Sequence, residues 1–352
     1  AGLPEITPMP ILDQRCLRPH MPPPSPANAD ETEHLIYDAL VELGWQADAR
    51  RLAKRVARLH LGLPREDEFA VICTWLGRCS LIHKLDQREN PTPLAEKFQV
   101  PDLLAVFVVD GQEVPVLIEV KSKKSKTLSF RADYHAGLKR YAALLNLPLL
   151  IAWKYHGIWT LFDIDHMSLA KTNYNVKFSK AISEGLLGVL AGDFSYSLAK
   201  GTGVHFQLHK EKLIFESNVG ATVEQQWQMR FDDIYYTDGE GTKRRDLSKE
   251  IEALFLVHDL ESSEGHTDTH ITMHFTIGED KDKFAHMSLV GLLDWQAPTG
   301  EGINWRAVAT RPKAVPGIDD FAKSIEDALQ EKVVTHIFHM LPQTRPSFLN
   351  TI

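Results

Sequence analysis

Residues 101–126 read PDLLAVFVVDGQEVPVLIEVKSKKSK, and this stretch determines the fold expected for the chain. Two apolar runs that are rich in β-forming residues, 103–109 and 114–120, flank Asp110-Gly111. An Asp-Gly pair between two apolar runs is a strong signal for a β-hairpin with a two-residue turn. The stretch therefore predicts two antiparallel strands that meet at Asp110-Gly111.

The length of this turn determines which side chains face each other. With a two-residue turn, Val109 pairs with Gln112. Asp102 then lies directly opposite Glu119, where Cβ atoms are about 4.5–5.5 Å apart. A four-residue loop would instead place Asp102 opposite Lys121. Because Glu119 and Lys121 are two residues apart, they share one face of their strand, and both registers gather the same three groups.

Asp102 and Glu119 at this separation repel each other, and without a cation one of them is expected to hold a proton. Mg²⁺ removes the conflict, since it takes oxygen ligands, typically one or two carboxylates with water and substrate phosphate. It also polarises a phosphoryl oxygen and lowers the pKa of a bound water, which Lys121 could orient. Lys121 could alternatively stabilise the charge that develops on the phosphoryl group. The structural alternative is an edge hairpin with solvated charges, but charged residues within such apolar strands are costly to bury.

The arrangement Pro101-Asp102 … Glu119-Val120-Lys121 resembles the PD-(D/E)xK nuclease superfamily, which includes restriction endonucleases, archaeal Holliday-junction resolvases and RecB-type nucleases. The resemblance covers roughly residues 30–165. It implies hydrolysis of phosphodiester bonds by water with Mg²⁺, and we expect Mn²⁺ to substitute for it. It further implies that Asp102, Glu119 and Lys121 are the catalytic residues, the two carboxylates as metal ligands and the lysine as the group that orients water.

A helix is expected over residues 30–43, because its apolar stripe ends at Leu43, directly before Gly44. Glu33 falls on the same stripe. Many members of the superfamily place a third acidic ligand on such a first helix, which makes Glu33 a candidate metal ligand by resemblance. The alternative is a capping box in which Asp30 is the N-cap and Glu33 its partner.

A basic cluster follows the motif. From Lys121 to Arg140 the chain has seven Lys or Arg and one Asp, in a protein with a net charge of −8. Charge runs are usually solvated faces. This run adjoins the two carboxylates, and we therefore expect it to contact phosphates. The candidate nucleic-acid-binding residues are Lys123, Lys124, Lys126, Arg131 and Lys139.

The neighbouring segments complete an α/β core. Further strands are expected at 79–85, 149–153 and 158–164, and a helix is expected to begin at Ser129 as its N-cap. The resulting order is an αβββαβ core of the restriction-endonuclease-like type, with a mixed central sheet covered by helices. On the helix after Ser129, Tyr134 falls on the apolar stripe and is expected to lie in the core.

Composition and the positions of Pro and Gly divide the 352 residues into three parts. Residues 1–29 contain eight prolines, which oppose helix and strand interiors and predict an extended arm. Residues 30–200 are expected to form the nuclease domain, with an insertion near 46–78. Residues 201–352 are expected to form an α+β domain that recognises a target or binds a partner.

In this last part, alternating patterns predict a late helix and several short strands. The helix is expected at 319–331, and the strands at 204–208, 233–237, 253–259, 270–277 and 284–293. His266, Asp268, His270 and His274 alternate along the chain and would share one face of a strand. Metal binding is one interpretation of this alternation, and a polar face turned to solvent is another.

The whole-chain composition bounds the class of protein. A net charge of −8 provides no overall basic field, so any nucleic acid must bind a local patch. Three cysteines suggest no disulfide framework and fit a reducing cytoplasm. No apolar run approaches the ~18–20 residues of a membrane span, and no membrane partner is expected.

We therefore expect a Mg²⁺-dependent endonuclease that cuts DNA. A restriction or phage-defence role is favoured by analogy, because a large additional domain suits target recognition. The alternatives are a nuclease for RNA, for junctions or for single strands, and a subunit or nucleic-acid-binding module that acts only with a partner. The C-terminal domain is also the expected site of a homodimer or of a protein partner.

Overall fold

A computed structural model of the chain describes residues 31–45, 48, 52, 65–85, 98–219, 222–279, 281–297 and 302–349. The chain separates into two compact units, residues 1–62 and 63–352. In the first unit, α1 (Glu31–Glu42) confirms the predicted helix, and Gly44 follows it with a φ of +66°. The arm predicted for residues 1–29 lies outside the described residues, and the boundary predicted near residue 200 stays a prediction.

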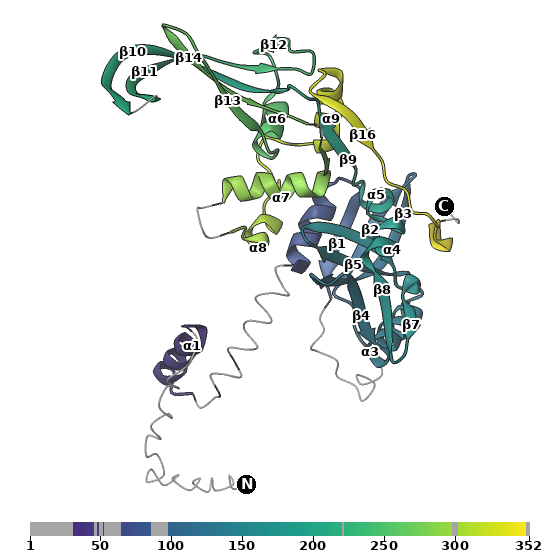
Figure 1. Cartoon of the computed structure of the whole chain (residues 1–352). Coiled ribbons are helices and arrows are strands. Elements are labelled where there is room, and N and C mark those ends of the chain that lie inside the picture. Colours follow the sequence, from purple (N-terminus) through teal and green to yellow (C-terminus); the bar gives the residue numbers. More distant parts are fainter. Residues whose placement is uncertain are drawn as a thin grey trace, which may run out of the picture. The chain divides into compact units, whose positions relative to one another are not determined.

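The second unit contains a five-stranded sheet in the order β1-β2-β3-β5-β6 (Figure 1). Its strands are β1 (Cys79–Lys84), β2 (Leu103–Val109), β3 (Gln112–Ser122), β5 (Leu149–Tyr155) and β6 (Ile158–Asp163). Strands β3 and β5 run parallel, whereas the other neighbours run antiparallel. The predicted mixed central sheet is therefore confirmed.

Two hydrophobic cores lie against this sheet, and β3 contributes to both because successive side chains of a strand point to opposite faces. Ile118 enters one core together with Phe69 from a helix over residues 65–75. Leu117 enters the other together with Leu138 from α3 (Ala132–Leu145). The expected α/β core with helices on the sheet is thus present. The helix over residues 65–75 that packs on this sheet lies within the range that the sequence suggested as an insertion.

A small sheet in the order β4-β8-β7 adjoins α3. Its strands are β4 (Thr127–Arg131), β7 (Ser168–Ala170) and β8 (Asn173–Lys177), and the short helix η3 (Ile164–His166) precedes β7. Ser129 lies within β4 and pairs with Asn175. The prediction that Ser129 caps the following helix is therefore wrong, because residues far along the chain supply a strand partner that the local pattern does not reveal.

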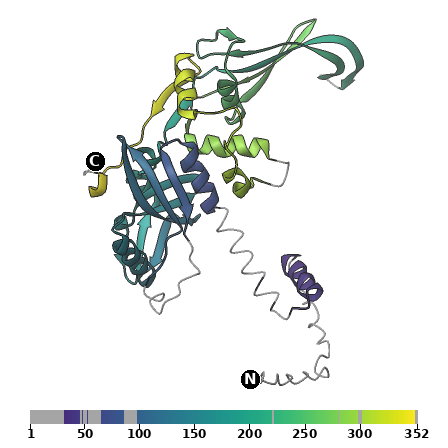
Figure 2. The ribbon, with the colours of Figure 1, turned by 180° about the vertical axis from the view of Figure 1, so that it is seen from behind.

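Two further sheets follow in the chain (Figures 1 and 2). The helices α4 (Phe178–Ser183) and α5 (Leu187–Ala191) lead into the sheet β15-β9-β16, which consists of β9 (Ser195–Leu198), β15 (Asp282–Phe284) and β16 (Val334–Phe338). The second sheet has the order β12-β11-β10-β14-β13. Its strands are β10 (Gly203–Val219), β11 (Thr222–Thr237), β12 (Lys243–Arg244), β13 (Glu261–His266) and β14 (His270–Thr276).

The remaining described elements are helical. They are α6 (Lys249–Glu252), η4 (Ala253–Leu256), α7 (Ala285–Gln296), α8 (Trp305–Ala309), α9 (Phe321–Gln330) and η5 (Ser347–Leu349). The helix predicted at 319–331 is confirmed by α9. The strands predicted at 253–259 and 284–293 are wrong, since short apolar runs without clear periodicity suit a buried helix as well as a strand. No described helix is long and apolar enough to cross a membrane.

The four alternating polar residues His266, Asp268, His270 and His274 do not share one strand. Strand β13 ends at His266 and β14 begins at His270, so Asp268 lies in the turn between them. His270 and His274 do share a face of β14, where they pair with His209 and His205 of β10.

Candidate active site

The Asp110-Gly111 turn fixes the register of β2 and β3. Asp110 has a φ of +50° and Gly111 a φ of +79°, and positive φ at both central residues is typical of the two-residue turn that suits a twisted hairpin. Val109 pairs with Gln112, and the register continues without a shift to Leu103 and Ile118. The prediction of a two-residue turn is confirmed and the four-residue alternative is excluded.

This register brings the predicted Asp, Glu and Lys together at the other end of the hairpin. Asp102, directly before β2, accepts a hydrogen bond from the backbone N–H of Val120 through Oδ2 (2.7 Å). The Lys121 Nζ donates to Oε1 of Glu119 and lies 3.9 Å from Oδ2 of Asp102. One ammonium group therefore contacts both carboxylates.

Burial gives these charges their unusual chemistry. Glu119 is fully buried, Asp102 is 8% exposed, and the Lys121 side chain is 26% exposed. Burial raises the pKa of Glu119 to about 7, with a further contribution from the charge of Asp102 and an opposing one from Lys121. Burial alone would lower the pKa of Lys121, but the charges of Glu119 and Asp102 outweigh it, and that pKa is raised. The lysine thus keeps its proton beside the two carboxylates.

Tyr134 is a member of this site that the sequence assigned to the core. It lies in the first turn of α3, and its hydroxyl donates to Oε1 of Glu119. Its ring packs edge-on against Phe130 (centroids 5.3 Å apart), so the ring is part of the core while the hydroxyl reaches the carboxylate. Burial, and then the charge of Glu119, raise the pKa of the Tyr134 phenol.

The two oxygens of Glu119 have different surroundings. Oε1 accepts from both Lys121 and Tyr134, whereas Oε2 is buried and has no hydrogen-bond partner among the described residues. A buried carboxylate oxygen without a partner is costly and calls for an explanation. Carboxylate oxygens are the donors that hard divalent cations prefer, so the donor set of Asp102 and Glu119 fits such a cation.

Residues 91–190 match the family model of the archaeal Holliday junction resolvases (Hjc). This segment contains the whole hairpin, α3 and strands β5 and β6, and the resemblance to PD-(D/E)xK nucleases is confirmed over it. A solved structure of the Holliday junction resolvase Hjc of Archaeoglobus fulgidus is also similar, with 21% identity and a TM-score of 0.28 over 34% of this chain and 89% of that chain. A search of curated protein sequences found no match to the chain.

Glu66 is an acidic residue that the sequence did not single out, and it lies N-terminal to the resolvase-like segment. Glu66, within the helical residues 65–75, has its pKa raised by burial and then by the charge of Asp102, while Lys84 opposes the shift. Its Oε2 lies 3.2 Å from Lys84 Nζ. The signal in the sequence was an acidic run, Glu66-Asp67-Glu68, directly before the apolar Phe69, ahead of the first core strand.

Glu68 shows what a structural carboxylate looks like in the same helix. It is fully buried, and Arg65 lies 2.7 Å from its Oε2. Its Oε1 accepts from Lys154 Nζ and from Trp159 Nε1, the latter at 3.0 Å. Both oxygens of Glu68 are therefore satisfied by protein groups, in contrast to Glu119.

Glu33 lies in α1, in the unit of residues 1–62, and its side chain is outside what the structure describes. Its assignment as a metal ligand stays a prediction. Within the described ranges, no three His, Cys, Asp or Glu side chains already stand together in a metal-binding arrangement.

The predicted phosphate-binding residues fall into two groups. Three exposed lysines follow β3 directly: Lys123, Lys124 and Lys126. Arg131 instead forms an ion pair with Asp133 (2.6 Å). Lys139 pairs with Asp165 at the same distance. All five side chains are exposed, and the lysine group is the part closest in sequence to Lys121.

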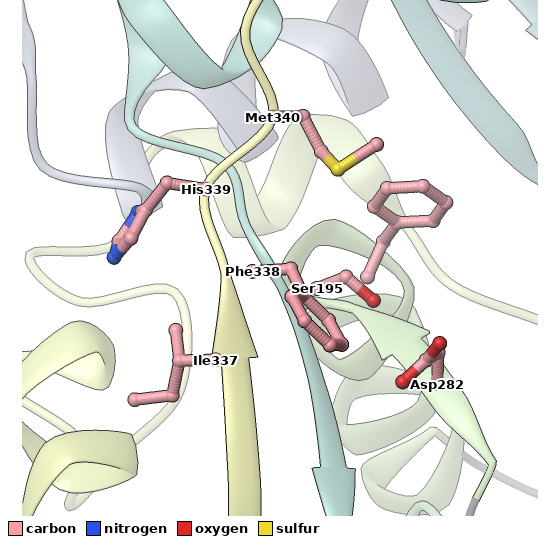
Figure 3. A pocket seen from close by; sticks show the side chains of 7 residues that line it. Ser195, Asp282, Ile337, Phe338, His339 and Met340 are labelled. Atoms are coloured by element: carbon pink, nitrogen blue, oxygen red, sulfur yellow. The ribbon is translucent and has the colours of Figure 1, made fainter.

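A hollow of about 600 Å³ lies elsewhere, along β9, β15 and β16 (Figure 3). Ser195, Asp282 and Phe338 are among the residues that line it. Asp282 accepts a hydrogen bond from Ser197 Oγ (2.5 Å). None of the predicted site residues lines this hollow, so its size does not make it the candidate active site.

Proposed function

We propose that this chain is a nuclease that hydrolyses DNA phosphodiester bonds with a divalent cation, Mg²⁺ or Mn²⁺, held by Asp102 and Glu119. The observation that carries the proposal is the buried carboxylate of Glu119, which has one oxygen bound by Lys121 and Tyr134 and the other without a partner among the described residues. The match of residues 91–190 to junction resolvases supports the same chemistry.

Each residue has a distinct part in this proposal. Asp102 and Glu119 provide oxygen ligands, and the cation, once bound, acts as a Lewis acid on the phosphoryl group. Lys121 keeps a positive charge next to both carboxylates, where it can stabilise the negative charge that develops on the phosphate. Tyr134 holds Oε1 of Glu119 and so orients the carboxylate.

Glu66 is the acidic residue that we propose as a third ligand or as an acceptor for water at the cation. Burial, and then the charge of Asp102, raise its pKa, which supports a place near the other carboxylates. Its partner Lys84 lies 3.2 Å away and is partly exposed. Glu33 is the competing candidate, and parallel variants Glu66→Gln and Glu33→Gln compare the two directly by the Mg²⁺ concentration needed for cleavage.

For the target, we favour branched DNA over a duplex sequence. A restriction or phage-defence role rests on the presence of a large additional domain, which is an argument by analogy. The family model that matches is one of junction resolvases, which favours recognition of DNA structure. The lysines at 123, 124 and 126 are the residues that we propose to contact the backbone, since phosphate contacts position a nucleic acid without reading its sequence.

The test uses the full chain with a labelled four-way junction, a linear duplex of the same sequences, a single strand and an RNA of equal length. We expect cleavage of the junction with Mg²⁺ or Mn²⁺ and none in EDTA. Asp102→Ala should lower the rate on the order of 100-fold or more while junction binding persists. Glu113→Ala, at an exposed carboxylate on the neighbouring strand β3, serves as the matched control and should retain the rate.

Cleavage that persists in EDTA, or full activity of Asp102→Ala, would contradict the metal mechanism. Equal cleavage of the junction and the duplex would favour the restriction-type role over junction resolution. Binding of DNA without cleavage under all these conditions would favour the alternative of a binding module or of a subunit that needs a partner.

A further inference from the structure

One side of the sheet β15-β9-β16 borders the hollow of about 600 Å³. By the strand register, Ser195 of β9 pairs with Phe284 of β15 on one side and with Phe338 of β16 on the other. Directly paired residues lie on the same side of a sheet, so a small serine lies between two phenylalanines. The hollow therefore has a serine at its base and an aromatic side chain on each side.

The next row of residues on the same side of the sheet is polar. Two residues further along the strands, Ser197 pairs with Asp282 and with His336. Ser197 is buried, and its Oγ donates a hydrogen bond to Oδ1 of Asp282 (2.5 Å). Among the described residues, no lysine or arginine forms an ion pair with Asp282. Its carboxylate is thus held in position by a neutral hydroxyl rather than by a cation.

The opposite side of this sheet packs on a hydrophobic core. Tyr196, next to Ser195 on β9, is fully buried in that core, and Ile337 of β16 packs against it. Lys283 pairs with Tyr196 and donates to the backbone oxygen of Val257, so its ammonium group belongs to the core side. Asp282 is the single carboxylate that lines the hollow, and no lysine or arginine of the described part of the chain lines it.

The rim of the hollow is apolar and exposed. Phe338 is 44% exposed, Met340 is 49% exposed, and the following Leu341 is 78% exposed. Figure 3 shows Phe338 and Met340 on the same side of their segment as Ser195, whereas Ile337 lies on the other side. Exposed apolar side chains that adjoin a concave site give a ligand additional surface to contact. The apolar surface thus continues from the hollow along the chain towards Leu341.

The strand spacing sets the distance between the two phenylalanines. Neighbouring strands are about 4.8 Å apart, so β15 and β16, on either side of β9, are roughly 9.6 Å apart. A cation midway between the two rings would lie about 5 Å from each, within the roughly 6 Å over which an aromatic face attracts a positive charge. Asp282 lies two residues from Phe284 on the same side of β15, at about 6.8 Å along the strand. Its carboxylate is therefore near the same position.

Charge indicates which kind of ligand fits between these side chains. Aromatic rings also stack on nucleobases, but nucleic acid binds through lysine and arginine contacts to its phosphates, and the hollow offers a carboxylate instead. A carboxylate beside two aromatic rings is complementary to a cation. Among cationic side chains, the planar guanidinium of arginine both stacks on aromatic rings and donates paired hydrogen bonds to a carboxylate.

We propose that the hollow is a docking site for an arginine side chain of a partner protein, which an extended segment of that partner presents. The guanidinium lies between Phe284 and Phe338 and pairs with Asp282, while an apolar neighbour in the segment contacts Met340 and Leu341. The volume of about 600 Å³ is within the range of about 300–1,000 Å³ that is usual for ligand sites. The site is separate from the proposed nuclease chemistry, since none of the proposed catalytic residues lines it.

Methyl NMR of the full chain, labelled at its methionine methyl groups, tests this proposal through the signal of Met340, which is identified by its loss in Met340→Leu. The probe is the peptide acetyl-Leu-Arg-Leu-amide, and we expect it to shift this signal saturably at millimolar concentration. The same peptide with citrulline in place of arginine should bind about tenfold more weakly, because it has the shape without the charge. Asp282→Asn should weaken binding of the arginine peptide by about tenfold, and Phe338→Leu by about fivefold.

Glu326→Gln is the matched control, since it removes a negative charge from an exposed position of α9 and should leave binding unchanged. The proposal would be overturned if Met340 did not respond, if the arginine and citrulline peptides bound equally, or if Asp282→Asn bound as the unaltered protein does.

Two further probes distinguish other ligands. Tighter binding of tetramethylammonium than of the arginine peptide would overturn the proposal in favour of a small quaternary ammonium compound. A response of Met340 to a single-stranded oligonucleotide but not to the peptide would overturn it in favour of a nucleobase. Because none of these measurements needs cleavage, failure of the proposed nuclease activity would leave their outcome unaffected.

Discussion

The β2–β3 hairpin and the β10–β11 hairpin use the same local pattern in different surroundings. The first has both faces covered, with β3 sending alternate residues into two cores, and its charged end is buried. The second leaves apolar side chains exposed and shifts register three times along its length. Burial therefore shifts the pKa values of the polar residues in the first hairpin. Exposure leaves the apolar residues of the second hairpin available for contact with another molecule.

The largest expected contrast is in stability. Phe107 in β2 is fully buried, and Phe231 in β11 is 66% exposed. Phe107→Ala should lower the free energy of unfolding by about 3–5 kcal/mol, because it removes packed surface and leaves a cavity. Phe231→Ala should change it by about 0.5 kcal/mol or less, because its side chain is mostly exposed. Chemical denaturation measures both losses, and similar losses would mean that Phe231 is packed within the chain as Phe107 is.

A smaller loss is expected at the charged end of the first hairpin. Lys121→Met removes the ammonium that both carboxylates share, and breaking a buried ion pair costs about 3 kcal/mol. Because Mg²⁺ supplies positive charge to the same carboxylates, it should raise the melting temperature of this variant more than that of the unaltered protein. Lys177→Met, at an exposed lysine, is the control. An equal response to Mg²⁺ in all three proteins would argue against cation binding at Asp102 and Glu119.

The second region should respond to pH through His205. Burial lowers its pKa from 6.5 to about 4, with further contributions from His274 and Lys243. The unfolded chain takes up a proton near pH 6.5 and the folded chain near pH 4. Stability should therefore fall by about 2 kcal/mol as the pH drops from 6.5 to 4, and level off below. Unfolding of His205→Gln across this range should show a weaker pH dependence, and an unchanged slope would remove His205 as the cause.

The smallest effect is expected from the residue that orients Glu119. Tyr134→Phe removes one hydrogen bond to Oε1 and should raise the Mg²⁺ concentration for half-maximal cleavage by about tenfold. Stability should change little, because the ring remains. Tyr141→Phe on the same helix is the control. A variant that loses stability but keeps its Mg²⁺ dependence would reduce Tyr134 to a packing residue.

The hairpin site could be predicted from the sequence because its determinants are local. Asp110-Gly111 specifies the turn, the turn specifies the register, and the register places Asp102 by Glu119. Tyr134 could not be found in this way, because the sequence pattern places its ring on an apolar stripe but does not show which group its hydroxyl contacts. Glu66 was missed because its acidic run lies in a segment that the sequence assigned to an insertion.

The errors elsewhere have the same origin. Residues 285–296 are mostly apolar, and burial on several sides removes the periodicity that separates a helix from a strand. Ser129 has a favourable side chain for a helix cap, yet pairing with Asn175, far along the chain, draws it into β4. Local signals predict a structure well when their partners are local, and poorly when distant segments compete.

The Asp110-Gly111 turn has a further consequence for how this protein tolerates change. Surface turns usually accept insertions, because little depends on them. This turn sets the pairing register of Asp102 and Glu119, which are each eight residues away, roughly 27 Å along the strand. One additional residue there would move every side chain of a strand to the opposite face. A single residue inserted at Asp110-Gly111 would therefore separate the Asp102 and Glu119 carboxylates and abolish activity, although the turn itself lies far from them.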